Sequence, residues 1–129
     1  MPELEGRASS RRSMPELDRL VHEPGRLAIL TLLSSVADAD FLFLQRATGL
    51  TKGNLSSHLS KLEEAGLVRI DKRFVRKKPQ TTVTISRLGR ERTARHWEQL
   101  EALRDQAVSA SQASQSARRS AASSRVRPA

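Results

Sequence analysis

Two short amphipathic segments joined at a glycine limit the folds open to this chain more than any other feature. The first begins after Asp38 or Asp40, either of which can cap a helix, and ends at Gly49, which suits the left-handed position that closes one. The second begins after Thr51, another capping residue, and stops at Gly66. Two short helices joined by a tight turn form a helix-turn-helix, so the spacing predicts this motif with its second helix over residues 51–65.

The second helix has an apolar side and a polar side. At about 100° per residue, three leucines fall on one side, where they can dock on a core. The opposite side offers an amide, a hydroxyl and an ammonium, which are groups that contact base edges and phosphates in the major groove of DNA. An ordinary amphipathic surface helix would show the same pattern. The leucines are Leu55, Leu59 and Leu62, and the polar residues are Asn54, Ser57 and Lys61.

The segments before this motif also predict helices. Ser13 and Glu16 have capping-box spacing, which predicts a first helix with an apolar face of Leu17, Leu20 and Val21. Pro24-Gly25 breaks or restarts that helix. A second, largely buried helical segment then carries Leu27, Ile29, Leu30, Leu32, Leu33 and Val36.

After Gly66 the hydrophobic period changes to that of strands. Val68, Ile70 and Phe74 fall on one face of an alternating run, and a second run contains Val83 and Ile85. A polar connection over residues 76–79 joins them as a hairpin. Ser86 then caps a long last helix with an apolar stripe of Trp97, Leu100, Leu103 and Ala107. The chain is therefore predicted to be α+β and mostly helical, with a two-stranded hairpin.

The predicted hairpin, residues 69–86, is strongly basic. From Arg69 to Lys78 there are six basic residues and one acid, Asp71. A cationic tip beside a DNA-reading helix can lie along the backbone or enter the minor groove. Alternatively, the charges keep an exposed strand edge from pairing with another sheet. The residues around the tip are Arg73, Arg76, Lys77 and Lys78.

Composition narrows the classes of partner and chemistry. The chain has 23 Lys plus Arg against 14 Asp plus Glu, a formal charge of +9, which favours nucleic acid first and an anionic membrane surface second. It has no cysteine, which excludes disulfides and thiolate metal sites. The longest apolar stretches are too short to span a bilayer, and no secretory signal is recognisable at the N-terminus, so we expect a cytoplasmic, nucleoid-associated protein.

Nothing in the sequence predicts catalysis, a cofactor or a bound metal. His22, His58 and His96 are far apart and fall in different predicted elements. No glycine motif for cradling phosphates is present. His22 beside Glu23 is better explained as a cap or buried-edge histidine at a helix start than as a sensor site. Trp97 is better explained by core or interface packing than by an effector pocket. The protein is therefore not expected to be an enzyme.

The predicted boundaries give three regions. Residues 1–13 form a flexible N-terminus, residues 14–108 form the domain with its last helix, and residues 109–129 form a disordered basic tail. The tail contains four arginines and no acid, and it is mostly Ser and Ala. If these arginines touch DNA, they act as mobile counter-charges.

Three strings of residues resemble the winged-helix bacterial regulators, closest to the MarR/ArsR-like group. They are His22-Glu23-Pro24-Gly25-Arg26-Leu27-Ala28-Ile29-Leu30, Thr51-Lys52-Gly53-Asn54-Leu55-Ser56-Ser57-His58-Leu59 and Leu62-Glu63-Glu64-Ala65-Gly66-Leu67-Val68. The resemblance covers roughly residues 15–105 and implies a three-helix core with a β-hairpin wing that binds duplex DNA. It implies that Lys52, Asn54, Ser56, Ser57, His58 and Lys61 face the groove and that Arg76, Lys77 and Lys78 make the wing contacts.

Two departures qualify the resemblance. Many relatives carry glycine where this chain has Arg76, which puts the shape of the wing turn in doubt. The last helix of relatives often opens with Pro-Glu, whereas here Arg87-Leu88 precedes Gly89, so its start is not fixed by the resemblance. The cysteine ligands of arsenic-type sensors are absent as well.

The function predicted from residues and resemblance together is a DNA-binding transcriptional regulator, a repressor that acts as a homodimer. Its small-molecule effector, if it has one, is unknown. The dimer surface is predicted on two helices and comprises Leu17, Leu20, Val21, Trp97, Leu100 and Leu103. The alternative is a non-enzymatic winged-helix assembly module that binds nucleic acid or anionic surfaces non-specifically.

Overall fold

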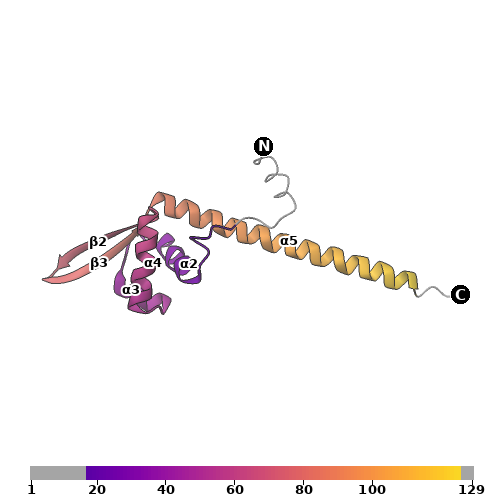
Figure 1. The fold of residues 1–129 in the computed structure, drawn as a ribbon, viewed down its shortest axis with the longest axis horizontal. Helices are drawn as coiled ribbons and strands as arrows, with labels where there is room; N and C mark the ends of the chain where they lie inside the picture. Colours follow the sequence, from indigo (N-terminus) through magenta and orange to yellow (C-terminus); the bar gives the residue numbers. More distant parts are fainter. Residues whose placement is uncertain (1–16, 126–129) are drawn as a thin grey trace. The chain divides into compact units, whose positions relative to one another are not determined.

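A computed structural model describes the backbone of residues 17–125 and the side chains of residues 17–122. The chain divides into two units, one spanning Leu17–Trp97 and the other including the helical residues from Glu98 onward. The elements, in order, are α2 (Pro24–Ser34), β1 (Ala39–Asp40), α3 (Phe41–Thr48), α4 (Lys52–Glu64), β2 (Val68–Val75), β3 (Lys78–Ile85) and α5 (Arg87–Arg125) (Figure 1). This order confirms the predicted α+β fold with its helix-turn-helix, hairpin and long last helix.

The helix-turn-helix is set by local hydrogen bonds that the sequence predicted. The Asp40 carboxylate accepts the backbone N–H of Phe43 at 2.7 Å, which begins α3. Gly49 has a φ of 71°, the left-handed conformation that ends α3. The Thr51 hydroxyl accepts the N–H of Asn54 at 3.1 Å and begins α4. Of the two aspartates that could cap α3, the structure uses Asp40.

The core is aliphatic because aromatic residues make up only 3% of the chain. Helices α2, α3 and α4 pack Ile29 and their buried leucines together against the inner face of the sheet. The predicted docking side of α4 is confirmed, since its three leucines are buried. Fully or almost fully buried are Ile29, Leu30, Leu33, Leu44, Leu55, Leu59, Leu62, Leu67, Val68, Val83 and Ile85.

The sheet has three strands rather than the two that were predicted. β2 and β3 pair from Val68↔Ile85 to Val75↔Lys78, so the hairpin turns in two residues, and Lys78 begins β3. β1 pairs with β3 through Ala39↔Val83. A two-residue strand is too short to show a period of two in sequence, which is why it went unpredicted.

Residues 17–23 form a turn instead of the predicted helix, and the predicted helix start at residues 13–16 lies outside the described residues. The Asp18 carboxylate accepts the N–H groups of Leu20 at 3.1 Å and Val21 at 3.3 Å, which holds the backbone in this turn. It also accepts two hydrogen bonds from the Arg92 guanidinium, at 2.8 and 2.9 Å. Mainly through the Arg92 hydrogen bond, the pKa of Asp18 lies below its usual value.

The turn removes one residue from the predicted dimer surface. Val21 is fully buried in the core of its own domain, so its side chain offers no surface to a second copy. Leu20 also packs against this core, and Leu17 is half-buried. Two of the three residues of the predicted apolar face, Leu20 and Val21, therefore belong to the internal core.

The start of α5 is fixed by a close approach to the turn between α4 and β2. The Ser86 hydroxyl accepts the N–H of Gly89 at 3.0 Å, which confirms the predicted cap. A Cβ on Gly89 would collide with the carbonyl oxygen of Leu67 and lie 2.8 Å from a side-chain carbon of Ile85. Only glycine allows this approach.

The second unit consists, in its described part, of α5 from Glu98 to Arg125. The sequence predicted a disordered tail from residue 109, and the helix through Arg125 corrects that prediction. Apart from Ser, residues 109–125 are all Ala, Gln or Arg, which are good helix formers, and they include neither Gly nor Pro. Disorder was predicted because the stretch has few hydrophobic residues. A lack of hydrophobic residues means that the stretch cannot pack in a core, but it does not lower its propensity to form a helix.

Candidate nucleic-acid interface

One column of α4 side chains points away from the domain. Asn54, Ser57 and Lys61 are exposed on the side of the helix opposite its buried leucines. The leucines fix the rotation of α4 about its axis, and this rotation fixes where the polar groups point. The structure therefore brings these three predicted residues together on one accessible surface.

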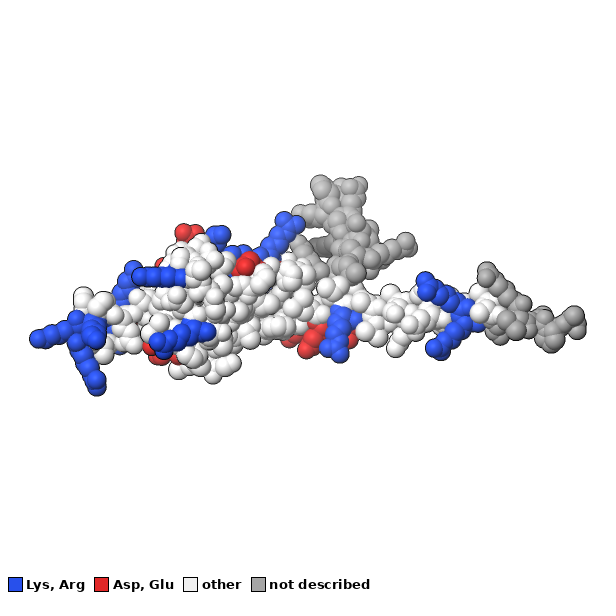
Figure 2. All heavy atoms as spheres, turned by 90° about the horizontal axis from the view of Figure 1, so that it is seen from below, with Lys and Arg blue, Asp and Glu red and all other residues white. Residues whose placement is uncertain are grey.

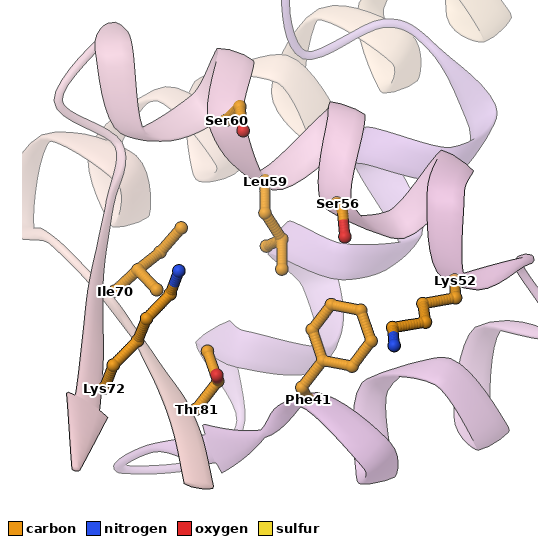
Figure 3. A pocket seen from close by; sticks show the side chains of 8 residues that line it. All are labelled: Phe41, Lys52, Ser56, Leu59, Ser60, Ile70, Lys72 and Thr81. Atoms are coloured by element: carbon orange, nitrogen blue, oxygen red, sulfur yellow. The ribbon is translucent and has the colours of Figure 1, made fainter. Parts of the chain in front are cut away.

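A second column of α4, with Lys52, Ser56 and Ser60 at i, i+4 and i+8, is turned toward the hairpin. These residues are exposed and line a hollow whose other wall includes Lys72 and Thr81 (Figure 3). Lys52 and Ser56 were predicted site residues, but they stand apart from the outward column. The exposed polar side chains of α4 therefore form two adjacent columns.

His58 does not lie with the other predicted contact residues. Its Nε2 lies 3.5 Å from Glu23 Oε2, and its Nδ1 lies 3.3 Å from a terminal guanidinium nitrogen of Arg26. The side chain is only 17% exposed. This corrects the placement implied by the resemblance: His58 attaches α4 to the start of α2, because it sits at the edge of the buried side of the helix.

Glu23, the α2 residue that His58 contacts, is held by several groups. Its carboxylate caps α2 by accepting the N–H groups of Gly25 at 3.0 Å and Arg26 at 2.8 Å. Burial works to raise the pKa of Glu23, but these hydrogen bonds and the nearby His58 and Arg26 outweigh it, so the pKa lies below its usual value. The carboxylate of Glu23, and not the side chain of His22, therefore caps α2.

The hairpin tip carries the predicted cluster of cations. Arg73, Arg76, Lys77 and Lys78 are all exposed around the turn. The end of the hairpin, at the left of Figure 2, shows Lys and Arg side chains with no acidic side chain among them. The tip is therefore the most cationic part of the surface in this view.

The turn itself is unusual in having two non-glycine residues in the left-handed region. Arg76 has a φ of 52° and Lys77 a φ of 66°. This is the pattern of a two-residue type I′ turn, for which Asn-Gly is preferred. Left-handed backbone costs an L-residue about 1–2 kcal/mol. The departure from glycine at residue 76 therefore leaves the wing turn tight but strained.

Two hairpin residues near the predicted site were missed. Lys72 was left out because only the tip was assigned to DNA. Phe74 was assigned to the buried face, but it is 76% exposed because the hairpin extends beyond the helices that cover its base. Strand alternation places Phe74 on the same face as Lys72 and Ile70. Counting residues from the last β2 position packed on the core, Ile70, could have shown that both lie beyond it.

The three histidines are less separate than their sequence positions indicated. His22 Nδ1 lies 3.0 Å from His96 Nε2, which ties the N-terminal turn to α5. Within the described part of the chain, no group of three or more His, Cys, Asp or Glu side chains could hold a metal ion. Among residues 17–125, no helix is long and apolar enough to cross a membrane.

A packed trio of helices, a helix-turn-helix and a β-hairpin beside its second helix define the winged-helix class. The chain belongs to the winged helix DNA-binding domain family, whose model matches residues 26–103. It is 38% identical over 65 residues to the uncharacterized protein MJ0432 of Methanocaldococcus jannaschii, covering 50% of this chain and 71% of that one. The resemblance to winged-helix regulators is therefore confirmed.

Solved structures agree with this assignment. A transcriptional regulator homologue from Pyrococcus horikoshii is 33% identical with a TM-score of 0.63, over 81% of this chain and 96% of that one. A MarR-family regulator from Silicibacter pomeroyi shares the fold at 23% identity and a TM-score of 0.54, over 68% and 58% of the two chains.

Proposed function

We propose that the protein is a sequence-specific regulator of transcription that binds duplex DNA as a homodimer and represses. The observation that carries this proposal is the exposed column of α4 beside a hairpin tip that bears four cations. The α4 column offers groups that distinguish bases, and the tip offers charge for phosphates. Membership of a DNA-binding family supports the same conclusion.

In this proposal, α4 enters the major groove. Asn54 can make two hydrogen bonds to adenine, and Ser57 is short enough to contact several bases. Lys61 reaches guanine or a phosphate, and the wing residues neutralise backbone charge. A protein bound in this way represses by occupying the promoter, and it acts at the nucleoid in the cytoplasm. The proposed function involves no catalytic step.

The homodimer rests on the surface around Trp97. This side chain is 43% exposed, and its indole N–H lies 3.4 Å from the Thr31 hydroxyl on α2. Hollows of about 280 and 400 Å³ adjoin it, and the larger is lined mainly by apolar residues of α2 such as Leu27 and Leu32. A second copy would cover this apolar surface. Leu100 and Leu103, both half-buried, remain part of the proposed dimer surface.

A small-molecule effector is a further part of the proposal. NadR, which resembles this chain in fold at 19% identity and a TM-score of 0.55, has been solved in complex with 4-hydroxyphenylacetate. This relation supports testing small organic acids against the protein–DNA complex.

Selection of bound sites from randomised duplex DNA tests the proposed function. We expect one preferred site, with paired half-sites about 10–10.5 base pairs apart, centre to centre. The unselected pool provides the random duplex for comparison. Binding that shows no preference between selected and random duplex would instead favour the assembly module.

The dimer can be tested with the protein's single tryptophan. If Trp97 is covered by a second copy, its emission should shift to shorter wavelength as the protein concentration rises. Trp97→Phe, which keeps an apolar ring, should remain dimeric in sedimentation, whereas Trp97→Glu should be monomeric with its fold intact. The homodimer would be contradicted if the protein sediments as a monomer at tens of micromolar and also binds DNA as one copy per site.

A further inference from the structure

The hollow between α4 and the hairpin is a built cleft. It has a volume of about 240 Å³ (Figure 3). Lys52 and Lys72 enter it from opposite sides, one from the first turn of α4 and one from β2. Its apolar floor is Phe41, Leu59 and Ile70, and its hydroxyl groups come from Ser56, Ser60 and Thr81.

The register of the hairpin explains why Lys72 faces α4. Lys72 is paired directly with Thr81, so both side chains lie on the same face of the sheet. The neighbouring residues of β2 point to the other face, where Arg69 Nε lies 3.4 Å from Asp71 Oδ2. The one acid of the hairpin is therefore paired outside the cleft.

The chemistry of the cleft is that of an anion site with an apolar base. Two ammonium groups and three hydroxyls line it, and no acid is among its lining residues. The ion pairs found among residues 17–122 include neither Lys52 nor Lys72. An anion in the cleft would be attracted by both ammonium groups and would accept hydrogen bonds from the hydroxyls.

Size favours an anion that belongs to a larger molecule. Pockets that enclose drug-sized ligands measure about 300–1,000 Å³, which is more than this cleft offers. Its rim residues Lys52, Ser56, Ser60 and Lys72 are all exposed, so a polymer can cross it. A sugar–phosphate unit matches both parts, because the sugar can lie on the apolar floor while the phosphate meets the lysines.

We propose that this cleft seats one backbone phosphate of the DNA duplex, held jointly by Lys52 and Lys72. This inference rests on the proposed function and deepens it. Because the two lysines belong to different elements, a phosphate shared between them connects the wing to α4. The seat thereby sets the position of the outward α4 column along the groove. Lys72, Ser60 and Thr81 become DNA contacts that the sequence did not predict.

The test replaces phosphates of the selected site one at a time with uncharged methylphosphonates. Affinity is measured for the unaltered protein and for Lys52→Ala, Lys72→Ala and the double variant. We expect one position at which the replacement weakens the unaltered protein about tenfold and weakens the double variant by less than twofold. Lys77→Ala removes one positive charge from the same hairpin and is the matched control. At that position, the methylphosphonate should weaken the binding of Lys77→Ala as much as it weakens the binding of the unaltered protein.

Salt dependence gives a second readout. Each neutralised phosphate contributes about 0.9 to the slope of log affinity against log salt. If both lysines hold one phosphate, each single variant should change the slope little, and the double variant should lower it by about 0.9. Slopes that fall by about 0.9 in each single variant and about 1.8 in the double would mean two separate phosphates and would overturn the shared seat.

Two further outcomes would overturn the proposal in different ways. If Lys52→Ala and Lys72→Ala each lose the response to methylphosphonate at a different phosphate, the two lysines do not share one phosphate. The proposal of DNA binding would be unaffected. If calorimetry without DNA shows inorganic phosphate or benzoate binding that the double variant loses, the cleft takes free anions instead. If the unaltered protein binds no duplex at all, the proposed function fails first. Circular dichroism checks that each exposed-lysine variant is folded.

Discussion

Helix α4 and the hairpin tip present opposite kinds of surface. α4 is anchored by three buried leucines and displays two uncharged polar side chains and one lysine on its outward column. The tip is exposed throughout, carries four cations and has two strained residues in its turn. Bases are distinguished by hydrogen-bond geometry, which needs a rigid support, whereas phosphates are attracted by charge, which tolerates motion. In the proposed complex with DNA, the two elements would therefore divide specificity and affinity between them.

Removing the charge of the tip gives the largest expected effect. Replacing Arg73, Arg76, Lys77 and Lys78 together with Ala should weaken binding to selected and random duplex by similar factors. At up to about 1 kcal/mol per exposed charge pair, the loss is up to about 4 kcal/mol. The salt slope should fall by up to about 3.6. Titrations at several salt concentrations check both values, and a loss confined to the selected site would mean that the wing reads sequence.

Changing the outward column of α4 should have the opposite signature. Asn54→Ala should cost about 1–3 kcal/mol on the selected site, relax the preference at one base pair, and leave the salt slope unchanged. Gln106→Ala, which removes an exposed amide from α5, is the matched control. If Asn54→Ala and Ser57→Ala both bind the selected site as well as the unaltered protein, the rotation assigned to α4 is wrong.

The attachment of α4 to α2 through His58 should make α4 more sensitive to acid than the hairpin. The pKa of Glu23 is lowered by folding, so its contribution is complete above the unfolded value near 4.5 and is lost as pH falls through the folded value. Glu23→Gln keeps one acceptor oxygen but loses the other and the charge, so it should cost up to about 1 kcal/mol. Between pH 5 and pH 3, the protection of the α4 amides against hydrogen exchange should fall less in Glu23→Gln than in the unaltered protein.

Glu91→Gln serves as the control for this acid response, because Glu91 pairs with Arg87 in an exposed position. The pKa of Asp18 is also lowered, so protonation of Asp18 should destabilise the whole domain over the same pH range in every variant. Equal loss of protection in α4 and in β2–β3, with or without Glu23→Gln, would show that His58 and Glu23 do not single out α4.

The parts that the sequence predicted correctly are those governed by local chemistry. Asp40, Gly49, Thr51 and Ser86 each act on the backbone within a few residues. Gly49, Thr51 and Ser86 were each assigned the observed role, and Asp40 was one of two candidates for its cap. The leucine spacing of α4 likewise determines which side is buried. These signals are contained in short stretches, so no tertiary information was needed to read them.

The parts that the sequence missed depend on partners distant in the chain. His58 turns inward because Glu23 and Arg26 lie there, and Lys72 joins the cleft because β2 pairs with β3 in one register. Val21 fills the internal core instead of a dimer surface for the same kind of reason. Position along the recognition helix therefore predicts the outward column well and its two flanks poorly, because each flank meets a different element.

The smallest expected effect separates the two properties of the tip, its charge and its strain. Arg76→Asn combined with Lys77→Gly keeps the two-residue turn and supplies the residues that type I′ geometry favours. Relief of left-handed strain, offset by the extra freedom of Gly in the unfolded chain, should raise the free energy of unfolding by up to about 1 kcal/mol. The same variant loses two charges, so its affinity for any duplex and its salt slope should both fall. Denaturant unfolding and salt titration together measure these opposite changes. A variant that is less stable than the unaltered protein would show that the long side chains of Arg76 and Lys77 stabilise the hairpin, and that their place in the turn is not held for DNA.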